Sequence, residues 1–221
     1  MSCLSKKGFW AIAVILLILI IDQIIKIWVK THMGIAWSDP TLNKVFNEIR
    51  ITDWFYIHFI ENNGMAMGIQ VIGKLFLSLF RIIATFAIAY YIYQLVKKDF
   101  KIAYILFVSM IFAGAAGNIV DSVFYGVIFS ESTPTQIAVL FPPEGGYGAW
   151  LHGKVVDMFY FPFFSFTWPS WIPFVGGSEF EFFKYVFNFA DACISVGAIV
   201  LLLFFRKTFS LSFENKKDSE N

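Results

Sequence analysis

The 221-residue sequence has few charged residues, few cysteines and few histidines. Only 15% of its residues are charged and 58% are hydrophobic, a balance that is unusual for a soluble globular domain. The formal net charge of +1 gives no indication of a nucleic-acid partner. Cys3 and Cys193 fall at predicted positions on opposite sides of a bilayer, which argues against a disulfide between them.

Recognisable metal and nucleotide motifs are also missing. His32, His58 and His152 do not have the spacing of zinc ligands. The sequence contains no His-Glu-x-x-His, no P-loop and no Gly-x-Ser-x-Gly motif. We therefore expect no metal site and no other cofactor.

The chain does contain long apolar runs. A bilayer core of about 30 Å takes about 20 helical residues to cross. Four segments meet this length, at about 9–29, 75–96, 102–121 and 185–205. The first continues through Asp22 to Val29 without a small-residue cleavage site, so it is predicted to be a retained helix and not a signal peptide. The sequence predicts one all-α membrane domain, residues 1–221, with four transmembrane helices.

Basic residues predict how the helices are oriented, because Lys and Arg accumulate in cytoplasmic segments. They precede the first span, fill the link between the second and third, and follow the fourth: Lys6, Lys7, Lys97, Lys98, Lys101, Arg206, Lys207, Lys216 and Lys217. Both termini are then cytoplasmic, and the segments 30–73 and 122–184 face outward. The charged tail, residues 208–221, is predicted to be disordered.

This topology places every carboxylate within the predicted spans at one depth. Asp22, Asp121 and Asp191 all fall near the outer surface, together with Lys26. Ionisable groups at the edge of the hydrocarbon are costly and usually functional. Each aspartate alone is explained equally well as a helix cap or an interfacial anchor, but capping explains their common depth poorly.

The spacing of these residues suggests paired acid–base chemistry. Asn118 with Asp121, and Asn188 with Asp191, form i,i+3 pairs that share a helix face. Two carboxylates that lie close together share one proton, so one can accept a proton from water while the other donates to a carbonyl oxygen. From the residues alone, the symmetry of the two motifs favours Asp121 and Asp191 as the pair, and leaves Asp157 in a loop.

The outward segments are aromatic. Trp54–Ile60 is rich in strand formers and predicts a small β platform on the membrane surface, although an ordinary hairpin fits as well. Phe159–Trp171 combines aromatics with prolines, which argues against a further span and favours a loop or helix in the membrane interface. Membrane anchoring is the simpler role for it, and a wall for a lipid-bearing substrate is compatible with anchoring.

Five motifs in order carry a family resemblance. They are Asp22-Gln23 with Lys26, Asn62-Asn63-Gly64-Met65-Ala66, Gly114-Ala115-Ala116-Gly117-Asn118-Ile119-Val120-Asp121, Val155-Val156-Asp157-Met158-Phe159, and Phe187-Asn188-Phe189-Ala190-Asp191-Ala192-Cys193-Ile194. The chain resembles lipoprotein signal peptidase (signal peptidase II), a family of bacterial membrane aspartyl proteases. The resemblance covers about residues 8–207.

The resemblance implies an endopeptidase that removes the signal peptide from diacylglyceryl-modified prolipoproteins, just before the lipidated cysteine. It places the catalytic dyad on Asp157 and Asp191 and not on Asp121. It implies supporting positions around the site for Asp22, Lys26, Asn62, Gly64, Asn118, Asp121 and Asn188, and a small extracytoplasmic β-cradle. Family members lie in the bacterial inner membrane with the site near the periplasmic surface, and globomycin occupies that site. We expect a monomer whose partners are the prolipoprotein and membrane lipids.

Three features depart from the family pattern. Ser122 stands where an arginine often follows the third motif, and Met67 replaces the usual aromatic. The connection between Gly126 and Asp157 is longer than is typical, and with 159–184 it suggests an enlarged outer lid.

Two other classes of function remain open from the residues. Intramembrane carboxylates also serve transporters and proton relays, but here they cluster at one end and do not line a path across the membrane. A non-enzymatic assembly factor is the third class, and such a protein does not need two aspartates within hydrogen-bond reach.

Overall fold

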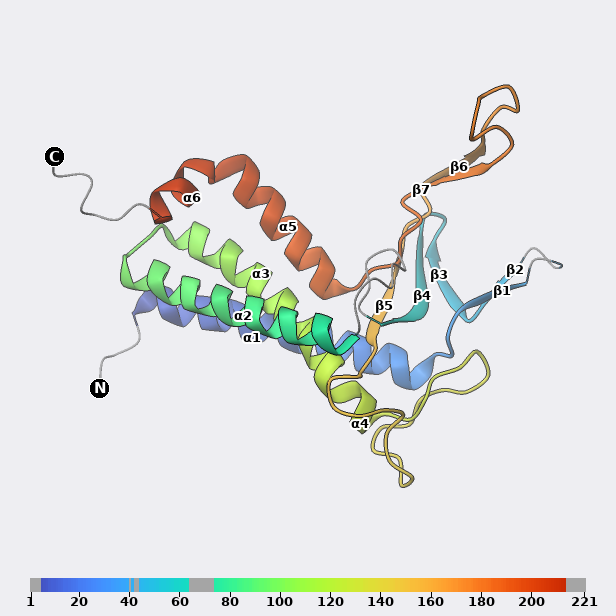
Figure 1. Cartoon of the computed structure of the whole chain (residues 1–221), viewed down its shortest axis with the longest axis horizontal. Helices are drawn as coiled ribbons and strands as arrows, with labels where there is room; N and C mark the ends of the chain where they lie inside the picture. Colours follow the sequence, from blue (N-terminus) through green and yellow to red (C-terminus); the bar gives the residue numbers. More distant parts are fainter. Residues whose placement is uncertain (1–4, 40, 42–43, 64–73, 214–221) are drawn as a thin grey trace.

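A computed structural model describes residues 5–39, 41, 44–63 and 74–213. Figure 1 shows a bundle of helices side by side, with the strands gathered beyond one end of the bundle and the two termini at the other end. The long axis of the molecule thus separates a helical part from a β-rich part. Gly64 and Met67 of the second motif lie outside the described residues.

The helical part consists of α1 (Lys6–His32), α2 (Lys74–Lys97), α3 (Ile102–Val120), a π-helical turn η2 (Asp121–Tyr125), α4 (Gly126–Ile128), α5 (Phe189–Phe204) and α6 (Arg206–Phe213). Among the described residues, three helical stretches are long and apolar enough to cross a membrane: Lys6–His32, Ser78–Lys97 and Ile102–Ile128. The pair α5 and α6 passes the same test together but is bent by 88°. The first three predicted spans are therefore confirmed as apolar helices.

The fourth predicted span differs from the structure in shape. It was expected over about 185–205, whereas α5 covers only Phe189–Phe204, 16 residues, and the chain turns sharply after Phe204. Asn188 caps its N-terminus by accepting a hydrogen bond from the Asp191 amide, which fixes the start of the helix close to the polar motif. The third helix is longer than predicted, because it continues past Asp121 to Ile128.

The β-rich part is larger than the small β platform that was expected beside the helices, since seven strands form three small antiparallel sheets. They are β1 (Trp37–Asp39) with β2 (Lys44–Phe46), β3 (Glu48–Thr52) with β4 (Phe55–Asn62) and β5 (Val155–Tyr160), and β6 (Phe164–Thr167) with β7 (Glu179–Phe182). The strand predicted near Trp54–Ile60 is confirmed as β4. Asp157 lies on β5 and not in a loop, because β5 pairs with β4 over Val155–Tyr160.

The aromatic segment that was expected to be an interfacial loop or helix is a β-hairpin. Strands β6 and β7 pair from Phe164–Phe182 to Thr167–Glu179, and Figure 1 shows the hairpin extending away from the helices. At its base, Phe161 stacks on Phe55 at 4.7 Å and on Phe187 at 5.6 Å between ring centroids. These rings tie the β3–β4–β5 sheet to the start of α5.

The long connection between Gly126 and Asp157 packs against η2 and α4. The amide of Gly153 donates to Ser122 O at 2.9 Å, and the amide of Gly148 donates to Gly126 O at 2.8 Å. A Cβ on Gly153 would overlap the carbonyl oxygen of Asp121, so only glycine allows this approach. The connection therefore rests directly on the backbone that carries Asp121.

A buried ion-pair cluster also holds the connection between Gly126 and Asp157 in place. Lys30 is fully buried, donates to Ser132 Oγ at 2.8 Å and pairs with Glu61. Lys154 reaches the other oxygen of Glu61 at 3.0 Å. Burial acts to raise the pKa of Glu61, but the ammonium groups of Lys30 and Lys154 together outweigh burial and leave that pKa below its usual value. Since Asn62 follows Glu61 on β4, the cluster also holds that strand in place.

Small residues let α3 and α5 approach closely. A Cβ on Gly114 would collide with Ala190 O, and would lie 2.7 Å from Ile194 Cγ1. Farther along the same pair of helices, a Cβ on Gly197 would lie 3.1 Å from Phe107 O. This is the packing that small residues permit between membrane helices.

We predict that Gly114→Ala lowers the free energy of unfolding by about 1–3 kcal/mol, because the added methyl group meets backbone that cannot rotate away. Unfolding of the purified protein in detergent measures the effect. Ala103→Leu adds a larger group at an exposed position of α3 and serves as the control. Equal stability of Gly114→Ala and the unmodified protein would show that α3 and α5 do not pack as described.

Candidate active site

The site lies where the ends of α1, α3 and α5 that face the sheets meet strand β5 (Figure 1). Asp22 of α1 is 1% exposed and accepts a hydrogen bond from the Ala190 amide at 3.0 Å. Asp22 Oδ2 also accepts from Gln23 Nε2 at 3.1 Å. A Cβ on Gly117 would stand 2.6 Å from Asp22 Oδ2, so the glycine of α3 leaves room for this carboxylate.

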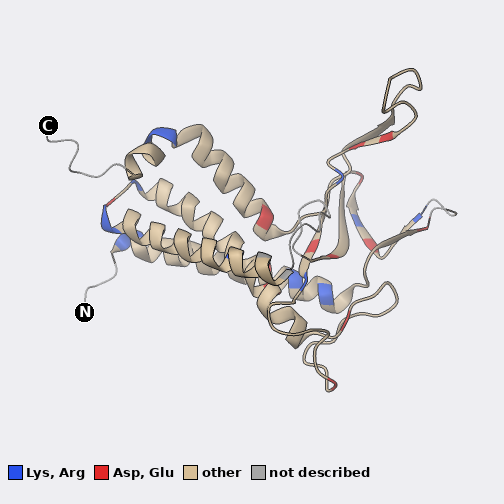
Figure 2. Ribbon diagram, in the orientation of Figure 1, with Lys and Arg blue, Asp and Glu red and all other residues tan. Residues whose placement is uncertain are grey.

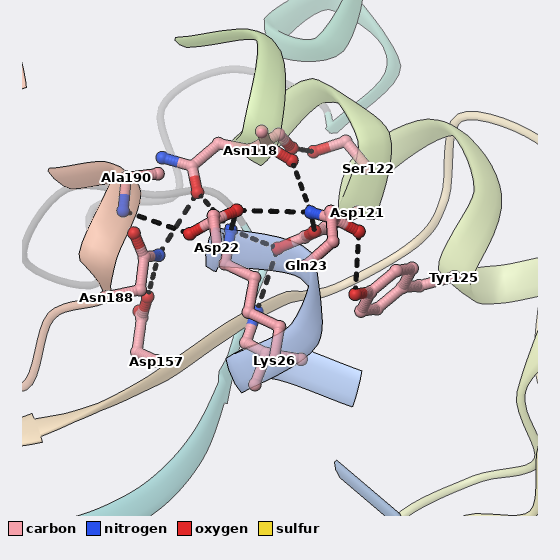
Figure 3. A network of polar contacts seen from close by, with 12 residues as sticks. Asp22, Gln23, Lys26, Asn118, Asp121, Ser122, Tyr125, Asp157, Asn188 and Ala190 are labelled. Atoms are coloured by element: carbon pink, nitrogen blue, oxygen red, sulfur yellow. Dashed lines mark hydrogen bonds and ion pairs between the residues drawn. The ribbon is translucent and has the colours of Figure 1, made fainter. Parts of the chain in front are cut away.

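Lys26 is the central cation of the site. Its ammonium is fully buried and pairs with Asp22 Oδ2 at 2.9 Å and Asp121 Oδ2 at 2.8 Å. It also donates to Asn118 Oδ1 at 2.8 Å. The i,i+4 pair expected within α1 is therefore present, and the same ammonium additionally joins α1 to the end of α3 (Figure 3).

Asp121 faces this cation. Its Oδ1 accepts from Gln23 Nε2 at 3.0 Å, and its Oδ2 accepts from the Val156 amide at 3.4 Å. With Lys26, these contacts occupy both oxygens of a fully buried carboxylate. Asp121 therefore holds α1, α3 and β5 together, and the geometry favours this supporting position over the partnership with Asp191 that symmetry suggested.

Asp157 is held by two side-chain amides. Asn188 Nδ2 donates to its Oδ1 at 2.6 Å, and Asn62 Nδ2 donates to its Oδ2 at 3.2 Å. The β4–β5 register places Asn62 opposite Val155, two residues before Asp157. Asp157 is 2% exposed, and the strand thus presents it to the start of α5 (Figure 3).

Asp191 is joined to Asp157 through a chain of two asparagines. Asn118 Nδ2 donates to Asp191 Oδ1 at 2.8 Å, and Asn188 Nδ2 donates both to Asn118 Oδ1 at 3.1 Å and to Asp157 Oδ1. Both Asn-x-x-Asp motifs therefore contribute their asparagine to one bridge. The amides orient the two carboxylates without adding charge to the site.

The electrostatics of Asp157 follow from this placement. Burial and, to a lesser extent, the negative charge of Asp191 raise the pKa of Asp157 to about 7, although the hydrogen bonds from Asn62 and Asn188 act in the opposite direction. The charge of Asp191 therefore acts on Asp157 across the site.

Three polar residues at the site were not singled out from the sequence. Gln23 links Asp22 to Asp121, and its Oε1 accepts a hydrogen bond from Tyr125 OH at 3.0 Å. Arg81 of α2 is close enough to interact electrostatically with both Asp157 and Asp191. Arg81 is an ionisable residue inside an apolar span, and this was the signal available in the sequence.

Ser122 uses its hydroxyl within the helix. It is buried and donates to Asn118 O at 2.9 Å, so the residue that replaces the family's usual arginine turns toward the backbone of η2. The positive charge next to Asp121 comes from Lys26. No group of three or more His, Cys, Asp or Glu side chains in the described part of the chain has the arrangement of a metal site.

Taken together, the apolar helices and the amide-bridged aspartates define an integral membrane protein with an aspartate-based site. A family model described as signal peptidase (SPase) II matches residues 14–207. A lipoprotein signal peptidase of Porphyromonas gingivalis is 52% identical over 219 residues, which cover 98% of this chain and 92% of that protein. One of Amoebophilus asiaticus is 34% identical over 204 residues, covering 90% and 79%. The chain belongs to the signal peptidase II family.

Solved structures agree on the fold. Two structures, each described as a bacterial membrane enzyme, superpose with TM-scores of 0.55 and 0.54 at 21% and 23% sequence identity. The first match covers 93% of both chains, and the second covers 89% of this chain and 92% of the other. The arrangement of helices and small sheets is therefore shared along nearly the whole chain.

We predict that Lys26→Met lowers the free energy of unfolding by about 3–5 kcal/mol, because it leaves two buried carboxylates without their cation. Adding Asp121→Asn to Lys26→Met removes one of those charges and should restore part of the loss. Unfolding of the single and double variants in detergent measures both effects. Strictly additive losses would mean that the two side chains do not interact.

Proposed function

We propose that this protein is an intramembrane aspartic endopeptidase that removes the signal peptide from diacylglyceryl-modified prolipoproteins, with Asp157 and Asp191 as the catalytic pair. The membership of the signal peptidase II family carries the activity and the substrate class. The observation that carries the choice of residues is the amide bridge, in which Asn188 and Asn118 connect the two carboxylates.

In this proposal the pair holds one proton at neutral pH. The ionised carboxylate accepts a proton from water, whose oxygen attacks the scissile carbonyl carbon, while the protonated carboxyl donates its proton to the carbonyl oxygen. A proton then returns to the amide nitrogen, the C–N bond breaks, and the new carboxyl and amino ends leave. The raised pKa of Asp157 supports this division, since it keeps a carboxylic acid available near pH 7.

The remaining polar residues support the pair. Lys26 forms ion pairs with both Asp22 and Asp121, and its positive charge is shared between these two carboxylates. Asn62, Asn118 and Asn188 keep the catalytic oxygens oriented. Gly64 belongs to the same motif as Asn62, and its proposed supporting role rests on the family resemblance alone.

The proposed orientation rests on the distribution of basic residues. Figure 2 shows Lys and Arg gathered at the end of the bundle where both termini lie, and this end is assigned to the cytoplasm. The bent pair α5–α6 then provides the fourth crossing, and the chain lies in the bacterial inner membrane as a monomer. The site opens near the periplasmic surface, with the β3–β4–β5 sheet as the cradle beside it.

A transporter or proton relay has less support. Its polar groups would need to continue across the membrane, whereas the described network lies at the ends of α1, α3 and α5 that meet the sheets. Family membership also points to proteolysis.

We predict that Asp157→Asn and Asp191→Asn each reduce turnover of a lipidated prolipoprotein by at least about 10²-fold, the range that general acid–base catalysis contributes. Cleavage of the purified precursor, followed by a mobility shift on a gel, measures turnover. Asp53→Asn changes an exposed aspartate and is the matched control. Near-normal turnover in either site variant would refute the assignment. Asp121→Asn should act mainly through stability.

A pH dependence follows from the raised pKa of Asp157. Between about pH 4, where an unfolded aspartate titrates, and about pH 7, the folded protein retains a proton that the unfolded chain has released. The free energy of unfolding therefore falls as pH rises through this window, and turnover falls as the shared proton is lost above about pH 7.

Thermal unfolding from pH 5 to pH 8 tests the stability part. Asp157→Asn has no titrating group at this position, so its stability relative to the unmodified protein should increase with pH. A constant difference across the window would show that Asp157 has an ordinary pKa.

A further inference from the structure

A large cavity lies at the opposite end of the bundle from the aspartates. Its volume is about 840 Å³, and α2, α3, α5 and α6 all contribute to its walls. That volume falls within the range of about 300–1,000 Å³ typical of small-molecule sites. A second cavity of about 400 Å³ shares Ile111, Leu201 and Phe209 with it, so the two form neighbouring compartments along α3 and α5.

The bend between α5 and α6 creates this space. The chain turns by 88° between α5 and α6, and α6 returns toward α2. Ser212 of α6 and Tyr104 of α3 each lie 2.6 Å from the hydroxyl of Tyr91 on α2. These hydroxyls form hydrogen bonds with one another and need no polar ligand as a partner. The interior of the cavity therefore suits an acyl chain.

The rim of the two cavities is cationic. Lys98, just beyond the end of α2, lines the larger cavity, and Arg206, at the start of α6, lines the smaller one. No carboxylate within the described ranges forms an ion pair with either side chain, whereas the neighbouring Lys7 pairs with Asp99 at 2.7 Å. Figure 2 shows that this end of the bundle is rich in Lys and Arg.

We propose that this cavity binds one membrane phospholipid with an anionic head group. An acyl chain fills the apolar interior between α2, α3 and α6, and the phosphate lies at the rim against Lys98, with Arg206 adding positive charge. Three observations carry the choice of occupant: the cavity lies beside membrane-spanning helices, its interior is apolar with internally paired hydroxyls, and its rim charge is opposite to that of an anionic lipid. The site is separate from the aspartates and does not depend on their role.

Native mass spectrometry of the full-length protein, released from detergent with added phosphatidylglycerol or phosphatidylcholine, tests the proposal. We expect one retained phosphatidylglycerol per chain and weaker retention of phosphatidylcholine. Lys98→Gln should weaken phosphatidylglycerol binding about fivefold, the effect of removing one cation near an anionic lipid. Lys101→Gln removes a charge from the same end without altering the cavity wall and should bind normally.

A second pair of variants tests the cavity itself. Ala87→Trp fills the larger cavity from an exposed position of α2 and should abolish retention, whereas Ile83→Trp, on the same helix but outside the lining, should leave it unchanged. Thermal unfolding confirms that both variants fold. Equal retention by Lys98→Gln and Lys101→Gln, or by Ala87→Trp and the unmodified protein, would overturn the proposal.

Other occupants give distinguishable results. If Ala87→Trp raises the KM for the prolipoprotein and leaves lipid retention intact, the substrate helix occupies the cavity and the lipid proposal fails. If glycerol phosphate competes with phosphatidylglycerol as well as a full lipid does, the rim binds free phosphate and the acyl chain contributes nothing, which also overturns it.

Discussion

The structure depends on one buried ammonium. Lys26 holds Asp22 of its own helix and Asp121 at the end of α3, and it donates to Asn118, the residue that leads to the aspartate pair. Two carboxylates buried at this depth are tolerable only with a cation between them. Because Asp22 also receives the Ala190 amide, the same charge fixes the start of α5. The three helices that carry the site are therefore fixed relative to one another by a single side chain.

The asparagines orient Asp157 and Asp191 within this frame. The side-chain oxygen of Asn188 caps α5, and its Nδ2 donates hydrogen bonds to Asp157 and Asn118. This one residue therefore links the start of α5 to strand β5 and to helix α3. Neutral amides suit this role, since a cation in the same place would lower the pKa of Asp157 and remove the acid form. The amides thus orient Asp157 without adding a positive charge beside it.

The two ends of the bundle are built on different principles. At the sheet end, small residues such as Gly114 and Gly117 bring backbones together and leave room only for specific polar contacts. At the other end, the chain bends by 88° between α5 and α6, and α2, α3, α5 and α6 surround a cavity lined mainly by aliphatic and aromatic side chains. Close packing of the helices at the sheet end fixes the polar side chains, and the cavity at the other end offers space for an acyl chain.

The sequence by itself determined the apolar helices, the common depth of the polar residues and the family, because hydropathy, basic residues and ordered motifs are local properties of the chain. It gave no physical reason to pair Asp157 instead of Asp121 with Asp191, because the positions of these carboxylates depend on the β4–β5 register and on the partners of Lys26. The hairpin at 164–182, the bend after Phe204 and the approach of Arg81 to the aspartates were likewise decided by tertiary structure. The approach of Arg81 depends on packing between segments that are distant in sequence, and hydropathy alone did not distinguish the hairpin from a loop or the bent helix pair from one continuous span.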